Sequence, residues 1–122
     1  MALLYETEEE ILRTVRGFET CQTPASDFHH REHLTVAVWY LQTLSPPAAV
    51  AAMRSALLQF VDHHGVDRKK YREEVTVFWV DAIASALEEM GSDAPLLDKC
   101  NRVISRFSAT TRRPAAPVAT EE

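Results

Sequence analysis

The sequence is poor in the residues that bend or cross-link a chain. Only 3 of its 122 residues are glycine and only 2 are cysteine. Scarce glycine disfavours collagen-like, linker-like and turn-rich β architectures. The two cysteines, Cys21 and Cys100, lie too far apart for a zinc ribbon and are too few for a disulfide framework. We therefore expect reduced thiols in a cytoplasmic protein.

Long apolar runs and an excess of positive charge are also missing. No apolar stretch approaches the roughly 18 residues of a membrane-spanning helix, and the first residues do not form a signal-peptide pattern. Lys and Arg number 13 against 18 Asp and Glu, which gives a net charge of −5 with neutral His. We expect no membrane partner and no nucleic-acid partner, because binding to phosphates depends on basic patches.

What remains is a composition and a periodicity typical of a small helical domain. Hydrophobic residues make up 46 % of the chain and charged residues 25 %. Apolar residues at helical spacing predict five helices, at about 8–19, 26–44, 46–64, 68–90 and 95–107. Residues 108–122 are rich in Thr, Ala, Pro and Arg without periodicity, so we expect a disordered tail after a single helical domain at 1–107.

Short connections between amphipathic helices favour an all-α fold, a compact up-down bundle. In such a bundle the second and fourth helices run parallel, so their starts lie at one end. The third helix would finish at that same end. Residues from three distant parts of the sequence are therefore expected to meet there.

The five histidines occur in two tight groups, His29, His30 and His33, and then His63 and His64. In the first group, i,i+3 and i,i+4 spacing places imidazoles on one helix face, as metal ligation from a helix requires. His29, His30 and His33 are therefore candidate ligands of a divalent metal, with His30 and His33 expected to face inward. The second group can simply stabilise a helix C-terminus.

The start of the fourth helix offers matching polar residues. Arg72 is in line with Thr76 on the apolar stripe, and a charge there needs a partner or a wet pocket. We expect His30, Tyr71, Arg72 and Thr76 to bind a small-molecule or anionic ligand. His33 and Glu73 are the candidate catalytic pair, because the pKa of His lies near neutral pH.

Structural roles explain the same residues without a ligand. The segment His29 to His33 can be a polar helix start, and Arg72 can form an ion pair with Glu73, Glu74 or Glu32. The segment also matches H-x-x-E-H, a zinc peptidase motif in which Glu acts as the base. Those peptidases are much larger proteins with a distant third ligand.

Three segments together resemble a family of small bacterial all-helical proteins. They read FHHxxHLxVAxxYL at 28–41, HHG at 63–65 and YxExxTxxxW at 71–79. The resemblance implies a bacterial helical protein and no particular activity. It also implies a His where this chain has Arg72, so a family three-His centre would lack one ligand here. An arginine in that place favours an anion instead.

The leading functional hypothesis is a His-rich polar pocket at one bundle end, which binds a small ligand or a metal and can be catalytic through His. One alternative is a non-catalytic interaction or assembly module, for example a homo-oligomer. Another is a pseudoenzyme partner with a degenerate site.

Overall fold

The protein is seen here in a computed structural model that describes residues 4–91 and 93–107. They form α1 (Glu8–Glu19), α2 (His30–Leu41), α3 (Pro46–His63), α4 (Glu73–Met90) and α5 (Leu96–Phe107), with no strand among them. Two short 3₁₀ helices, η1 (Ala25–Asp27) and η2 (Arg68–Lys70), precede α2 and α4. The predicted all-α fold of about five helices is confirmed, and the predicted tail at 108–122 lies outside the described residues.

Local signals fix several helix ends. At the start of α1, the Thr7 hydroxyl accepts a hydrogen bond from the Glu10 amide at 3.3 Å, and the Glu10 carboxylate accepts one from the Thr7 amide at 3.3 Å. At the start of α3, the Ser45 hydroxyl accepts from the Ala48 amide at 3.4 Å. Gly91, with φ at 84°, ends α4. These ends lie where the sequence predicts them.

The helices α2 and α4 begin later than predicted, each after a 3₁₀ turn. The turn η2 is held by Asp67, whose carboxylate accepts a hydrogen bond from the Lys69 amide at 2.9 Å. As a result, His29 and Arg72 are the residues that precede α2 and α4, and both have an extended backbone. Arg72 was predicted to face inward because it continues the apolar stripe of a helix. Since neither His29 nor Arg72 has a helical backbone, their side chains do not continue these stripes.

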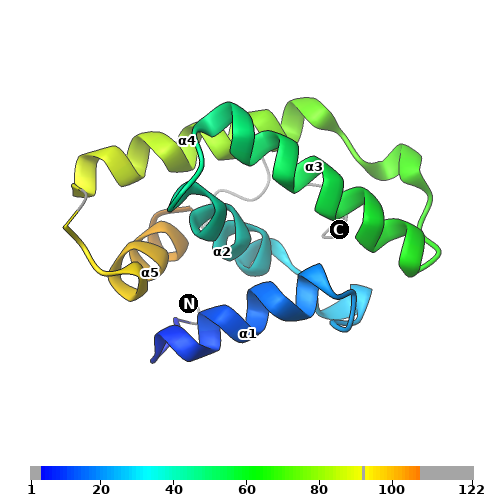
Figure 1. Cartoon of the computed structure of the whole chain (residues 1–122), viewed down its shortest axis with the longest axis horizontal. Coiled ribbons are helices and arrows are strands. Elements are labelled where there is room, and N and C mark those ends of the chain that lie inside the picture. The colour runs from blue at the N-terminus through cyan, green and yellow to red at the C-terminus, as the bar shows by residue number, and fades with distance from the viewer. Residues whose placement is uncertain (1–3, 92, 108–122) are drawn as a thin grey trace.

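The central element is α2, which contacts each of the other four helices. Figure 1 shows it nearly end-on, with α1 below, α3 and α4 above, and α5 at its side. Six consecutive residues of α2, His33 to Val38, are buried. A helix that is buried on every side must be enclosed by neighbours, and this requirement sets the arrangement of the other helices.

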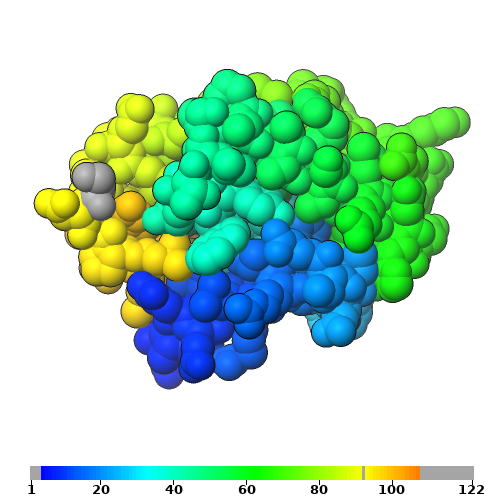
Figure 2. Space-filling view, in the orientation of Figure 1, coloured from blue at the N-terminus to red at the C-terminus, as the bar shows by residue number. Residues whose placement is uncertain are grey.

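Aromatic rings fill the core beneath the start of α2. The rings of Phe18 and Phe28 stack at 4.4 Å, and Phe60 lies 5.3 Å and 5.2 Å from them. All three are fully buried. Figure 2 shows that side chains close the spaces between the ribbons, with α1 in blue along the lower edge of the molecule. No described helix is long and apolar enough to cross a membrane.

A glycine lets the chain turn back against the end of α1. The amides of Gln22 and Thr23 both donate to the Gly17 carbonyl, at 2.9 Å and 3.1 Å. A Cβ atom on Gly17 would lie 2.4 Å from Oγ1 of Thr23, which is too close for two non-bonded atoms. The absence of a side chain at Gly17 therefore places Thr23 beside α1.

We expect Gly17→Ala to stabilise the protein by less than the roughly 1 kcal/mol by which alanine normally exceeds glycine in a helix interior. The reason is that the Thr23 hydroxyl, which would lie 2.4 Å from the new Cβ atom, has to rotate away. In a Thr23→Ala background the contact is absent, and the same change should give the full gain of about 0.5–1 kcal/mol. Urea unfolding of all four proteins measures the difference. Equal gains in the two backgrounds would contradict it.

Candidate functional site

The first turns of α2 and α4 enclose a small cavity beside α3. Its volume is about 10 Å³, which is about enough for one water molecule. We call it the histidine pocket. It is lined by His30, His33, Leu34, Ala37, Met53, Thr76, Trp79 and Val80. The predicted meeting of the starts of the second and fourth helices is therefore seen, and it brings together His30, His33 and Thr76.

Polar atoms without partners gather around this cavity. They are Nδ1 of His30, both ring nitrogens of His33 and Nε1 of Trp79, all buried and without a hydrogen bond. Each such atom costs about 1–3 kcal/mol, and native proteins contain only a few of them. The four atoms belong to side chains that line the cavity, although the cavity wall itself is formed almost entirely by apolar atoms.

His33 is a buried titratable residue of the pocket, with only 4 % of its surface exposed. The ring of Phe28 lies against it at 4.5 Å. Burial, followed by the charges of His30 and His29, lowers the pKa of His33 to about 3. The imidazole is therefore neutral at physiological pH, with one donor and one acceptor nitrogen. Its catalytic role was predicted from the near-neutral pKa of an ordinary histidine. Burial lowers the pKa of His33 and so removes the basis of that prediction.

His30 connects the pocket to the end of α5. Its Nε2 lies 3.3 Å from the Phe107 carbonyl oxygen, so Nε2–H is the donor of this hydrogen bond and Nδ1 remains an acceptor. Its ring packs against Trp79 at 4.9 Å, and Trp79 packs against Phe107 at 5.7 Å. Burial lowers the pKa of His30. Phe107 thus contacts two lining residues of the pocket from α5, a helix that sequence reasoning did not connect with the site.

Glu73 lies at the start of α4 in a network of its own. Its carboxylate accepts hydrogen bonds from Nε and Nη2 of Arg54 at 2.9 Å and 2.6 Å, and from the Tyr71 hydroxyl at 2.8 Å. These bonds lower the pKa of Glu73 to about 2. Burial raises the pKa of Tyr71 to about 12, although the side chain of Thr76 opposes this. Glu73 is therefore a bound, ionised carboxylate that does not line the cavity.

Arg72 and His29 both point away from the pocket. The Arg72 side chain is 60 % exposed and pairs with Glu74 at 3.2 Å, so its predicted inward orientation is wrong and the structural ion pair is confirmed. His29 is exposed, and its amide donates to Glu32 Oε1 at 2.9 Å. Glu32 therefore caps α2 and is not placed as the base of a zinc peptidase.

The predicted metal centre is not formed in the part of the chain that the structure describes. Within 4–91 and 93–107, no three His, Cys, Asp or Glu side chains are grouped so that they could hold a metal ion. The set His29, His30 and His33 fails because His29 faces solvent while His33 faces the core. Since Arg72 also lies outside the pocket, the idea of a metal site that lost one ligand there has no structural support.

The second histidine group lies near the first without joining it. The ring of His64 packs on Phe60 at 4.5 Å, Phe60 lies 5.2 Å from Phe28, and Phe28 lies 4.5 Å from His33. Both groups are thus at the same end of the molecule, with two phenylalanine rings between them. His63 is exposed at the end of α3.

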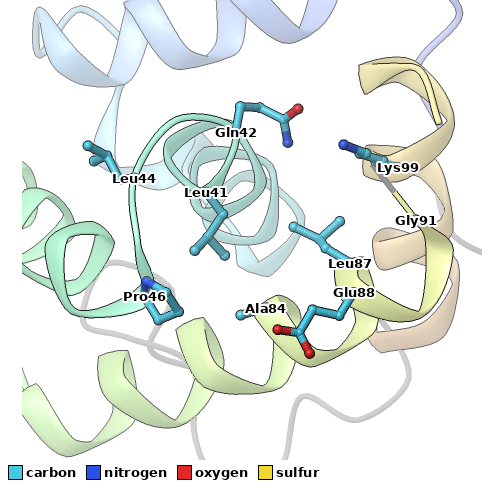
Figure 3. Close-up of a pocket in the computed structure, with 9 residues that line it drawn as sticks. All are labelled: Leu41, Gln42, Leu44, Pro46, Ala84, Leu87, Glu88, Gly91 and Lys99. Carbon is cyan, nitrogen blue, oxygen red and sulfur yellow. The ribbon is translucent and has the colours of Figure 1, made fainter. Parts of the chain in front are cut away.

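A larger hollow of about 450 Å³ lies at the opposite ends of α2 and α4. Figure 3 shows Leu41 and Leu87 at its centre, with Gln42 and Lys99 on one side and Glu88 on the other. It contains none of the predicted site residues. Its charged groups stand at the rim of an apolar surface, whereas the histidine pocket has its polar atoms buried.

No family model, curated protein or solved structure matches this chain. The resemblance to a family of small bacterial proteins therefore stays a prediction. Function has to be inferred from the chemistry of the site.

We expect the free energy of unfolding to decrease as the pH falls from 6.5 to about 3. In the unfolded chain His33 binds a proton near the usual pKa of 6.5, whereas in the folded chain it stays neutral down to about 3. The unfolded state therefore binds more protons in this interval, so acid favours unfolding. The total loss should be roughly 3–5 kcal/mol.

A pair of variants isolates the contribution of His33. His33→Gln should reduce the pH dependence between about pH 7 and about pH 5, where few carboxylates titrate, and His30, whose pKa is also lowered by burial, should account for part of what remains. His63→Gln changes an exposed histidine and should leave the pH dependence as it is. Urea unfolding across the pH range measures both slopes. The same slope in His33→Gln and in the unmodified protein would rule out a buried neutral His33.

Proposed function

We propose that the protein binds a small neutral polar molecule in the histidine pocket. The observation that carries this proposal is the group of four unpartnered, buried polar atoms on side chains that line a single cavity. A structural role for these side chains would require hydrogen bonds within the protein, and the described residues supply none to these atoms. A bound molecule would supply them.

The polar atoms of the pocket specify the kind of ligand. The indole N–H of Trp79 is a donor only, Nδ1 of His30 is an acceptor, and His33 offers one of each. No charged side chain lines the cavity. A charged ligand would lose its hydration without gaining a counter-charge, which is unfavourable in a buried site. A neutral group with a donor and an acceptor, such as a carboxamide or an alcohol, matches this set.

A ligand larger than water requires the cavity to widen. Phe107 lies beside two of the lining residues, with a ring contact to Trp79 at 5.7 Å and a carbonyl that accepts from His30 at 3.3 Å. Its ring also lies 5.4 Å from the Arg106 guanidinium and packs against the apolar core. A movement of the end of α5 would break these contacts, and new hydrogen bonds to the ligand would have to offset their loss.

The site suits binding better than acid–base catalysis. An efficient general base has a pKa near the working pH, whereas the pKa is about 3 for His33 and about 2 for Glu73. Glu73 is also fully engaged with Arg54 and Tyr71. The proposal therefore assigns binding roles to His30, His33, Thr76 and Trp79, and it assigns no catalytic role to His33 or Glu73.

Acetamide tests the proposal directly, with fluorescence of Trp79 as the readout. The chain has two tryptophans, so Trp39→Phe leaves Trp79 as the only indole. We expect a saturable change with acetamide and none with acetate, which has the same shape but carries a charge. A change that is linear in acetamide, or one equally large with acetate, would contradict a neutral polar site.

Replacing the pocket hydroxyl should weaken binding at little cost in stability. Thr76→Val keeps the shape of the side chain but removes a buried hydroxyl that acts on the Tyr71 hydroxyl, so we expect a loss of no more than about 1 kcal/mol in the free energy of unfolding. Acetamide affinity should fall several-fold in the same variant. Thermal unfolding and the fluorescence titration measure the two effects. Unchanged acetamide affinity in Thr76→Val would contradict a binding role for the hydroxyl.

A second candidate function, self-association, rests on an exposed apolar surface of α4. Phe78 is 47 % exposed and its neighbour Val77 is 36 % exposed. Large exposed apolar side chains mark interaction surfaces when they are adjacent, and a two-fold axis would bring two such faces together. Sedimentation should then show a dimer that Phe78→Ser converts to monomer. A monomer at all concentrations would exclude this function.

A further inference from the structure

A second polar hollow lies between α1 and the first turn of α2, separate from the histidine pocket. Its volume is about 460 Å³, and none of its lining residues is shared with the histidine pocket. Two arginines and two threonines line it, together with one carboxylate. The lining residues are Leu4, Tyr5, Glu10, Arg13, Thr14, Thr23 and Arg31.

Arg31 is held in place but keeps an unused donor. Its guanidinium lies 4.2 Å from the centre of the Tyr5 ring, a cation–π contact. Its Nε is buried and forms an ion pair with Glu32 Oε2 at 3.6 Å, which is too long for a hydrogen bond. A buried guanidinium N–H without a hydrogen-bond acceptor is costly, so Arg31 keeps a donor that an anion could use.

The Tyr5 ring that supports Arg31 is itself fixed from both ends. Its hydroxyl lies 3.2 Å from Thr14 Oγ1 and 3.0 Å from Thr35 Oγ1. Its backbone amide donates to Asn101 Oδ1 at 2.9 Å, and its carbonyl accepts from Asn101 Nδ2 at 2.9 Å. Four hydrogen bonds to three helices thus hold the ring, and the position of Arg31 above it is preorganised.

Arg13 and Thr23 add further donors to the same hollow. Within the described residues Arg13 forms no hydrogen bond or ion pair, and its charge is felt only by Glu10. The Thr23 hydroxyl also has no hydrogen-bond partner there, and the Gly17 turn holds Thr23 against α1 through a 3.1 Å bond. The hollow therefore presents two guanidinium groups and a hydroxyl with unused donors.

Glu10 is the one acidic residue of the hollow, and its carboxylate is already occupied. Its Oε1 accepts hydrogen bonds from the amides of Glu6 and Thr7 at 2.7 Å and 3.3 Å. These bonds lower the pKa of Glu10, so it stays ionised as the cap of α1. With two arginines and one glutamate, the lining carries one net positive charge, and Glu32, outside the lining, pairs with Arg31 at 3.6 Å.

We propose that this hollow binds a small molecule through a phosphate or carboxylate group held by Arg13 and Arg31. Guanidinium groups match the oxygens of both anions and form charge-assisted hydrogen bonds with them. Arg31 supplies the buried, preorganised donor, Arg13 the accessible charge and Thr23 a neutral donor. Leu4 leaves an apolar edge for the rest of the molecule. An anion site was predicted at Arg72, and the geometry favours this arginine pair instead.

Titration with inorganic phosphate and with acetate at constant ionic strength tests the proposal, with the Nε–H signal of Arg31 as the NMR readout. We expect a saturable shift with at least one of the two anions. A response to phosphate alone assigns the site to phosphate groups, and a response to acetate alone assigns it to carboxylates. No saturable shift with either anion would overturn the proposal.

Three variants distinguish specific binding in this hollow from non-specific attraction of anions to positive charge. Arg13→Gln changes an exposed side chain and should fold normally, with at least a ten-fold loss of affinity. Arg31→Gln should abolish binding but also removes the packing on Tyr5. If the Arg31→Gln protein does not fold, the Arg13→Gln variant decides the test. Arg72→Gln removes a positive charge of the surface that pairs with Glu74 and should have no effect. An equal loss of anion affinity in Arg72→Gln and Arg13→Gln would show that the attraction is non-specific, and it would overturn the proposal.

Discussion

The arrangement of this protein depends on the burial of α2 on all sides. Four helices surround it, and the six residues from His33 to Val38 are removed from solvent. Burial of this stretch includes an imidazole, which cannot keep its usual pKa there. The same packing that stabilises the domain through its apolar residues therefore buries polar atoms at the first turn of α2. In the histidine pocket, several of these buried atoms form no hydrogen bond with the described residues.

The first turn of α2 also separates two kinds of chemistry. Successive residues of a helix point about 100° apart, so His30 and His33 face α4 whereas Arg31 faces α1. On the α4 side the polar atoms are neutral and enclosed. On the α1 side they are charged, with Arg13 exposed and Nε of Arg31 buried. One short segment thus contributes to both proposed sites, and this explains why its composition is unusual for the start of a central helix.

The charged side chains near the histidine pocket form ion pairs outside the cavity. Glu73 is bound by Arg54 and Tyr71, and Arg72 by Glu74. Exposed pairs of this kind contribute little to stability, but here they fix the side chains at the start of α4. They keep both the carboxylate and the guanidinium from entering a cavity that holds neutral groups. The cavity is therefore lined by uncharged side chains alone.

The sequence by itself determined the parts of this protein that depend on neighbouring residues. The capping box of Thr7 and Glu10, the Ser45–Pro46 start of α3 and the glycine after α4 are local signals, so the all-α fold and these helix ends could be predicted. The inward positions of His30, His33 and Thr76 follow from helical spacing. Tertiary structure decided the rest. The 3₁₀ turns before α2 and α4 moved His29 and Arg72 off the helical stripes. Phe107, Arg54 and the contact between Arg31 and Tyr5 come from segments distant in sequence, and periodicity within one helix carries no information about which residues another helix brings to it.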